Sequence, residues 1–135
     1  MADRILPSKT DRDTGGFFQA ADRRELVYKA CDDCGTVINP PRAHCAKCGS
    51  WNTSWKQASG KARLNTWSVV HQQVHPMFPA PYTIVVVELE DAPGIRYVGY
   101  MDGAHDLHEG MAMRVRFEPT EDGGALPLWM PDNAE

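Results

Sequence analysis

Apolar and polar residues alternate in short runs through the second half of the chain, and this alternation predicts β-strands. It is strictest over residues 111–118, where every second residue is apolar. Residues 82–90 are apolar on both faces, which is typical of a central strand. For residues 111–118 we expect an inward face of Met111, Met113, Val115 and Phe117 and an outward face of Arg114, Arg116 and Glu118.

A longer strand is predicted at residues 62–73. Its apolar positions lose phase between Leu64 and Trp67, as they do where one strand carries an extra residue. We therefore expect a β-bulge or a sharp bend there. Such a bend would let one strand serve two faces of a curved sheet.

Two further strands complete the predicted set, at residues 95–101 and 125–130. Pro127 and Pro131 limit the last of them to a sheet edge, because proline lacks the N–H that a ladder needs. Five strands, the first long and bent, match a small Greek-key barrel of the OB type. The predicted fold class is therefore mainly β, with a five-stranded OB-fold barrel.

The first half of the chain has a different character. A short helix is expected from Asp13 or Thr14 onward. Strands at residues 26–30 and 51–57 then bracket a cysteine-rich segment. The character of the sequence changes again near residues 58–60, where we place a domain boundary.

Three aromatic residues are candidates for a partner interface. Phe17 and Phe18 are adjacent, so one face of a short helix cannot bury both in a small core. An aromatic side chain left at the surface is a common anchor for another protein. The predicted interface comprises Phe17, Phe18 and Trp129, and packing of both phenylalanines against the chain's own ribbon or sheet is the alternative.

All four cysteines lie in one segment, as two C-x-x-C pairs separated by ten residues (35–44). Each pair is followed by a glycine, which can adopt the positive φ that turns backbone N–H groups toward the sulfurs. Four thiolates make a closed tetrahedral site, the form typical of structural zinc. The sequence thus predicts a rubredoxin-like zinc ribbon with the ligands Cys31, Cys34, Cys45 and Cys48.

Two other uses of the cysteines stay open. Iron binds the same arrangement of four thiolates, so an iron site is an alternative to zinc. Disulfides are the other alternative, although residues 1–13 lack the apolar core of a secretion signal. His44 precedes Cys45, but we expect it at the surface because four thiolates already complete the site.

Composition and charge narrow the class of protein. With 135 residues, 42% hydrophobic and 24% charged, the chain can form one ordinary core plus a small metal-bound unit. No apolar run reaches the ~18 residues needed to span a bilayer, so we expect a cytoplasmic protein. The net charge of −4 disfavours binding to nucleic-acid phosphates.

Taken together, these residues resemble the family known as DUF35, whose members join an N-terminal helix and a zinc ribbon to an OB-fold. The matching stretches are FFQAADRRELVYKACDDCG, PPRAHCAKCGS, WKQASGKARLNTWSVV, PYTIVVVELED and EGMAMRVRFE. Ala62 departs from the family, in which a second glycine often follows the SG pair. The expected units are an arm, helix and lead-in strand (1–30), a zinc ribbon (31–58) and an OB-fold barrel with its tail (59–135).

The resemblance implies a non-catalytic accessory subunit of a thiolase-superfamily acyl-CoA enzyme. The implied partner is a thiolase or a thiolase-like retro-aldolase, including those that shorten steroid side chains. It further implies a heteromer with two copies of each subunit and acyl-CoA at the shared interface.

CoA phosphates require cations or free backbone N–H groups. The chain has one concentrated positive stretch, on the ribbon and at its junction with the barrel. Our hypothesis is that this stretch faces the phosphates at the boundary with the partner, and a solvated junction is the alternative. It comprises Arg42, Lys47, Lys56, Lys61 and Arg63.

Catalysis by the chain itself is not expected, because the sequence has no GxSxG, HExxH, P-loop or GxGxxG motif. Four histidines could build a second metal site or an acid–base pair with a nearby carboxylate, but exposed loop histidines are the expectation. These residues are His71, His75, His105 and His108, with Glu88 or Asp106.

Two other functions stay open beside the accessory role. OB barrels commonly bind single-stranded nucleic acid by stacking bases on aromatic side chains, and the negative net charge argues against this use here. The second is electron transfer by a rubredoxin-like iron site. The aromatic residues available for stacking are Trp67, Tyr82, Tyr97 and Tyr100.

Overall fold

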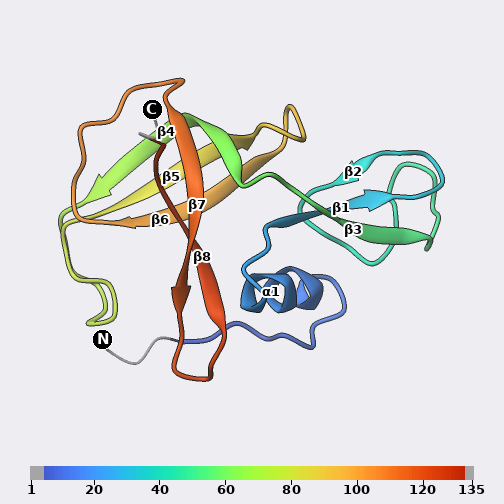
Figure 1. Ribbon diagram of the computed structural model, residues 1–135, viewed down its shortest axis with the longest axis horizontal. Coiled ribbons are helices and arrows are strands. Elements are labelled where there is room, and N and C mark those ends of the chain that lie inside the picture. Colours follow the sequence, from blue (N-terminus) through green and yellow to red (C-terminus); the bar gives the residue numbers. More distant parts are fainter. Residues whose placement is uncertain (1–4, 133–135) are drawn as a thin grey trace.

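The computed structural model describes residues 5–132, which form one short helix and two antiparallel sheets (Figure 1). The helix is α1 (Gly15–Asp22), and the smaller sheet comprises β1 (Val27–Cys31), β2 (Val37–Ile38) and β3 (Thr53–Gln57). The larger sheet comprises β4 (Lys61–Val70), β5 (Tyr82–Leu89), β6 (Arg96–Asp102), β7 (Ala112–Pro119) and β8 (Ala125–Pro131). The predicted mainly β fold is confirmed. The largest shift in a predicted strand is at the end of β4, which stops at Val70 rather than at residue 73.

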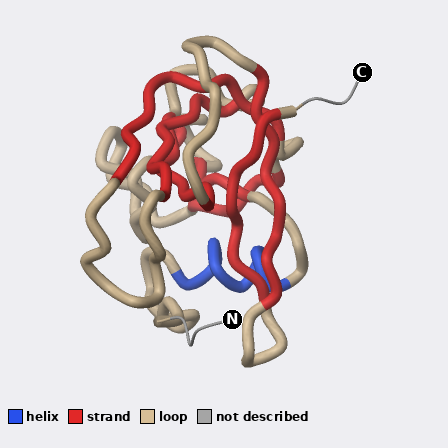
Figure 2. Tube along the Cα trace, turned by 90° about the vertical axis from the view of Figure 1, so that its left-hand side faces the viewer, coloured by secondary structure: helices blue, strands red, loops and turns tan. Residues whose placement is uncertain are grey.

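The five-stranded sheet has the strand order β6-β5-β4-β7-β8. Its first strand, β4, pairs along its length with β5 and through residues 61–63 with β7. The register shifts between Leu64 and Thr66, which confirms the predicted irregularity and gives β4 the bend that a small barrel needs. In Figure 2 the strands curl into a ring, and α1 crosses below it.

The two outer strands of this sheet, β6 and β8, meet where the ring closes. A Cβ at Gly99 would collide with the indole of Trp129, so glycine is what lets the two strands approach. Trp129 itself is 3% exposed. Side-chain packing rather than a hydrogen-bonded ladder closes the barrel at this point.

The main core lies inside the barrel. Leu64, Val85, Val87, Leu89 and Met113 are each no more than 1% exposed. Burying a side chain of this size stabilises a fold by about 1.5–3 kcal/mol relative to leaving it in water. Strands β4, β5 and β7 therefore contribute to one continuous core.

Two hydrogen bonds fix the smaller sheet against the barrel. The Tyr97 hydroxyl donates to the Val27 carbonyl at 2.8 Å, and Asn39 Nδ2 donates to the Arg96 carbonyl at 3.2 Å. Burial raises the pKa of Tyr97, so its hydroxyl stays protonated and able to donate. A further bond, from Ala58 N to the Leu26 carbonyl at 2.8 Å, extends the β1–β3 ladder by one pair toward the barrel.

An ion-pair network anchors the segment before α1. Lys9 Nζ lies 2.8 Å from Asp22 Oδ2 and 2.7 Å from Asp122 Oδ2. Asp22 also accepts a hydrogen bond from the backbone N–H of Ala125 at 3.1 Å. The Lys9 ammonium lowers the pKa of both carboxyl groups. The network thus joins the N-terminal segment, the helix and the β7–β8 hairpin.

The outward face of β7 is partly covered. Glu118 shares this face with Arg116, whose Nη1 lies 3.9 Å from its Oε1, but the Glu118 side chain is only 12% exposed. Arg116 also reaches Asp102 on β6, 3.5 Å away, because the barrel brings β6 toward the β7–β8 hairpin. The sequence pattern of β7 alone does not reveal this curvature.

The predicted domain limits stay a prediction. Helix, smaller sheet and barrel are joined by the hydrogen bonds described above, so the structure draws no sharp line at residue 30 or 58. The first four residues of the predicted N-terminal unit and the last three of the predicted barrel unit lie outside the described residues. Within the described residues, no helix is long and apolar enough to cross a membrane.

The end of α1 carries a strained residue. Arg24 has a φ of +61°, a left-handed conformation that residues with a side chain rarely adopt. Its backbone N–H donates to the Ala21 carbonyl at 2.9 Å, and the N–H of Glu25 donates to the Ala20 carbonyl at 3.0 Å. Glycine is the residue normally found at this position of a helix terminus.

Arg24→Gly should therefore raise the free energy of unfolding by about 0.5–1 kcal/mol, because it relieves the left-handed strain. Chemical denaturation measures the change. Arg23→Gly is the matched control. Arg23 has an ordinary φ of −89°, so glycine relieves no strain there and should only lower the free energy of unfolding. Destabilisation of the Arg24 variant by as much as the control would contradict the prediction.

Candidate functional site

The four cysteine sulfurs converge at one end of the smaller sheet. All four Sγ atoms lie within 4.8 Å of one another. The Sγ atoms of Cys31 and Cys48 are 3.6 Å apart, and so are those of Cys34 and Cys45. Four sulfurs around one zinc ion with bonds of ~2.3 Å would be separated by about 3.8 Å. A disulfide needs ~2.05 Å, and all four cysteines are free.

Both C-x-x-C turns are built in the same way. Gly35 donates its N–H to the Cys31 carbonyl at 2.9 Å, and Gly49 donates to the Cys45 carbonyl at 2.8 Å. Their φ values are +77° and +76°, as the sequence predicted. A Cβ at either position would meet nothing within 4 Å, so the need for glycine is conformational and not steric.

The protein environment shifts the pKa values of Cys34 and Cys48 in opposite directions. The Thr36 hydroxyl, 3.1 Å from Cys34 Sγ, and the Thr36 backbone lower the pKa of Cys34 to about 6. The Ser50 backbone lowers the pKa of Cys48, but the neighbouring Cys31 thiol, burial and other sulfurs outweigh it and raise this pKa to about 12. Four adjacent thiols cannot all ionise alone, so a cation must supply the balancing charge.

Carboxylates on the first turn stiffen its surroundings. Asp32 accepts hydrogen bonds from Ser54 at 2.8 Å and from Lys56 at 3.1 Å, and Asp33 accepts from Ser50 and Asn52. These bonds tie the first turn to the segment that follows the second. The donor set is therefore four sulfurs held by a shell of hydrogen bonds, which suits a structural metal and leaves no position for substrate.

His44 does not join the sulfurs. Its ring stacks on Trp51 with centroids 4.9 Å apart, and Arg12 lies 5.4 Å from the same indole. Trp51 is 63% exposed, so this stack forms part of the ribbon surface.

The structure separates the basic residues that the sequence grouped. Lys56 is paired with Asp32 on the ribbon. Lys61 lies opposite Arg114 in the β4–β7 ladder, and Arg63 lies two residues further on the same face of β4. This barrel cluster contains Arg114, which the sequence reasoning left out. The remaining members of the predicted group, Arg42 and Lys47, are exposed on the ribbon between and within the two turns.

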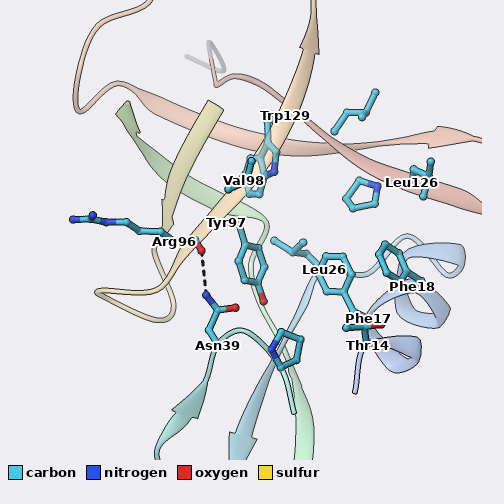
Figure 3. A pocket seen from close by; sticks show the side chains of 13 residues that line it. Thr14, Phe17, Phe18, Leu26, Asn39, Arg96, Tyr97, Val98, Leu126 and Trp129 are labelled. Atoms are coloured by element: carbon cyan, nitrogen blue, oxygen red, sulfur yellow. Dashed lines mark hydrogen bonds between the residues drawn. The ribbon is translucent and has the colours of Figure 1, made fainter. Parts of the chain in front are cut away.

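A pocket of about 410 Å³ lies where helix, ribbon and barrel meet (Figure 3). Phe17 and Phe18 from α1 and Tyr97 from β6 form much of its wall, and Trp129 lies at its barrel end. Asn39 reaches the pocket from the ribbon. The Arg96 side chain points away from the cavity, so the lining is almost wholly aromatic and aliphatic.

The three predicted interface aromatics are thus brought together, and the prediction of an interface stays a prediction. Phe17 is in edge-to-face contact with Phe18 at 5.1 Å and with Tyr97 at 5.8 Å. Both phenylalanines are half-buried rather than one of them fully exposed. Trp129 is a buried wall residue. Sequence reasoning missed Asn39 and named Tyr97 only as a stacking residue, because their places in the pocket depend on contacts between distant segments.

The histidines are not gathered into a site. Among the described residues, the group of side chains close enough together to hold a metal ion consists of the four cysteines and includes no histidine. His75 Nδ1 accepts the Met77 N–H at 3.1 Å, and His105 Nε2 lies 2.5 Å from the Asp102 carbonyl. These histidines order their own loops.

The predicted stacking aromatics are also divided. Tyr97 faces inward and binds Val27, whereas Tyr82 and Tyr100 pack together at 5.4 Å on the barrel surface. Phe78 covers both, with centroid distances of 6.1 and 5.6 Å. The cluster packs on itself instead of presenting separate ring faces.

A four-cysteine ribbon joined to an OB-type barrel defines the class of this protein. Its sequence matches the rubredoxin-like zinc ribbon domain of ChsH2 over residues 18–52 and the C-terminal OB-fold domain of ChsH2 over residues 55–118. The fold is similar to a chain of the solved Ltp2-ChsH2(DUF35) aldolase, with a TM-score of 0.83 and 30% identity. The match covers 93% of this chain and 98% of that one.

A DUF35 domain-containing scaffold protein of Methanocaldococcus jannaschii is 34% identical over 73% of this chain and 72% of its own length. The chain belongs to the DUF35 family. A protein named a probable enoyl-CoA hydratase alpha subunit, of Thermomonospora curvata, is 33% identical over 90% of this chain. The match spans 38% of the length of that subunit.

Cys45→Ser should abolish metal binding and unfold the ribbon. Structural zinc contributes ~10–16 kcal/mol to small zinc-binding folds, as much as the whole stability of an ordinary domain. Metal analysis should give about one ion per wild-type chain and far less for the variant, and hydrogen exchange should show lost protection in β1 to β3.

Ala46→Ser is the matched control, because it places the same hydroxyl at an exposed position of the same turn. It should retain metal and protection. A Cys45→Ser chain that keeps the ribbon protected under strong chelation would exclude the metal site.

Proposed function

We propose that this chain is a non-catalytic accessory subunit that binds and supports a thiolase-superfamily acyl-CoA enzyme, either a thiolase or a retro-aldolase. The observation that carries the proposal is the similarity, along nearly its whole length, to the DUF35 chain of an aldolase assembly. The scaffold name of the archaeal relative supports the same role.

The chemistry of the chain's own sites supports an accessory role. Its cysteines converge on one closed site and are buried or hydrogen-bonded there. Its pocket is lined mainly by rings and aliphatic groups, and the Asn39 amide and the Tyr97 hydroxyl at its wall already donate to backbone carbonyls. The fixed angle between ribbon and barrel is what a supporting subunit needs, because two rigid surfaces can then contact a partner together.

Zinc is the metal proposed for the ribbon, with the four cysteines as ligands. Zinc holds the two turns together, and the hydrogen bonds of Thr36 and Ser50 orient the thiolates. Iron would indicate an electron carrier instead. The two metals are distinguished directly, because a ferric four-thiolate site is red and a zinc site is colourless.

The narrower proposals follow the family resemblance. They are a heteromer with two copies of each subunit, acyl-CoA at the shared interface, a cytoplasmic location and a steroid side chain as one candidate acyl group. The enoyl-CoA hydratase name of the bacterial relative supports an acyl-CoA context. The cationic face of Lys61, Arg63 and Arg114 is the proposed contact for the CoA phosphates.

Co-expression with thiolase-like subunits encoded beside this chain should give a stable complex that contains both proteins and about one zinc ion per copy of this chain. Size-exclusion chromatography with light scattering measures the stoichiometry. The complex, and not this chain alone, should turn over an acyl-CoA substrate. An isolated chain that converts acyl thioesters unaided would refute the accessory role.

Reversal of the barrel cations tests the CoA contact. Lys61→Glu combined with Arg63→Glu should weaken acyl-CoA binding by the complex on the order of tenfold, since two exposed attractions become repulsions. Calorimetry at two salt concentrations measures the loss. The control is Arg23→Glu with Arg24→Glu, an equal charge change at the end of α1, and equal effects from both pairs would remove the cluster from the CoA site.

A further inference from the structure

The closure of the barrel leaves two strand edges facing each other. Strands β6 and β8 are the two ends of the five-stranded sheet, and no ladder joins them in the portion of the chain that the structure describes. The contact of Gly99 with Trp129 closes one end of the gap. Toward the start of both strands the gap opens over the apolar pocket, which residues 96–98 and 126–129 line. We call this gap the seam.

Backbone groups of β6 point into the seam. Leu89 donates its N–H to the Ile95 carbonyl at 3.0 Å, so residue 95 faces β5. Antiparallel ladders alternate between bonded and non-bonded pairs, and therefore Arg96 and Val98 direct their N–H and C=O groups away from β5. The bond from Asn39 Nδ2 to the Arg96 carbonyl agrees with this assignment. Val98 remains as the open position of the edge.

The opposite edge is protected. Thr120 donates its N–H to the Gly124 carbonyl at 3.0 Å, so these two residues form a hydrogen-bonded pair. Bonded and non-bonded pairs alternate along the β7–β8 ladder, and therefore the backbone groups of residues 127 and 129 point away from β7 and toward the seam. Pro127 has no N–H to offer there, and Pro131 occupies a further position of the same phase. Proline is a common way to prevent an edge from pairing. The β6 edge has no such protection at Val98.

The exposed side chain of Val98 favours the binding of another chain at this edge. Val98 is 74% exposed, an unusual state for a β-branched residue in the middle of a strand. It follows Val86 of β5 on the barrel surface. An edge position with an exposed apolar side chain and no proline can pair with another chain.

Charges across the sheet define what could pair there. Arg63 of β4 lies opposite Glu88 of β5, which lies opposite Arg96 of β6. The charges in this row therefore alternate in sign from β4 to β6. A strand added beside β6 would continue the alternation if it placed an acidic residue opposite Arg96. Figure 3 shows the Arg96 side chain on the side away from the pocket, where that residue would lie.

We propose that the seam receives an extended segment of the thiolase-like partner subunit, which pairs with β6 at Val98 by strand addition. Its residues alternate between the two faces. One face carries an acidic side chain beside Arg96 and an apolar one beside Val98, and the other places an apolar side chain in the pocket between Tyr97 and Trp129. The assignment rests on the proposed function, because the segment belongs to the partner.

Val98→Pro tests the strand addition, because it removes an N–H that faces the seam and takes no part in the β5 ladder. Val98→Thr is the matched control, since it keeps both the N–H and the shape of the side chain. The probe is a phage-displayed library of random dodecapeptides, selected on the whole metal-loaded chain. Enriched peptides should alternate apolar residues and include an acidic one.

Val98→Pro should weaken binding of the enriched peptides about tenfold, the effect of losing one or two hydrogen bonds, and Val98→Thr should not. Arg96→Glu should turn the selection toward basic peptides, whereas Arg96→Lys should leave it acidic. This second pair keeps the test decisive if the proline variant does not fold, which circular dichroism establishes. Absence of enrichment, or equal binding by all variants, would overturn the proposal.

Two outcomes separate this inference from the proposed function. A partner subunit that co-purifies equally with wild type and with folded Val98→Pro overturns the seam and leaves the accessory role standing. Failure of any thiolase-like subunit to co-purify with wild type removes the accessory role. An isolated chain that dimerises, and becomes monomeric as Val98→Pro, would assign the seam to a second copy and overturn the proposal.

Discussion

The convergence of four thiolates on one point is the constraint on which the ribbon depends. The buried cluster around it contains Cys31, Ile38 and Cys45 and little else, which is too small a core to hold a sheet with a two-residue strand such as β2. Electrostatics acts in the same direction, since sulfurs 3.6 Å apart repel each other once ionised. A bound metal ion would remove this repulsion and take the place of the missing core.

The influence of the metal extends beyond its ligands. The segment between the two C-x-x-C turns is held at both ends by cysteines, and it carries Asn39 to the Arg96 carbonyl and Pro41 to the pocket. Tyr97 ties the other side of the ribbon to the same strand through Val27. The shape of the pocket and the accessibility of the β6 edge thus follow from how the thiolates are held. A metal that fixes the two turns would therefore also fix the position of this segment against the barrel.

Sequence reasoning succeeded where the cause of a structure is local. The ribbon turns follow from cysteine and glycine spacing, the bend of β4 from a slip of phase after Leu64, and the edge position of β8 from Pro127. Residues that act across the fold were not predictable in this way. Phe17, Asn39, Tyr97 and Leu128 are far apart in sequence, and only the closed barrel places them around one cavity. Lys56 was grouped with Lys61 by proximity along the chain, yet it pairs with Asp32 on the ribbon.

Side-chain packing and the state of the strand edges explain how a small barrel can act as a support. Its interior is packed with side chains such as Val85 and Met113, each 0% exposed, as is usual for a barrel of this size. Binding surfaces must then lie where closure is incomplete, and β8 is blunted by proline while β6 is open at Val98. A sheet edge gives affinity through backbone hydrogen bonds and selects its partner through the alternating side chains beside it. An accessory subunit can therefore recognise one enzyme with a surface that carries no reactive group.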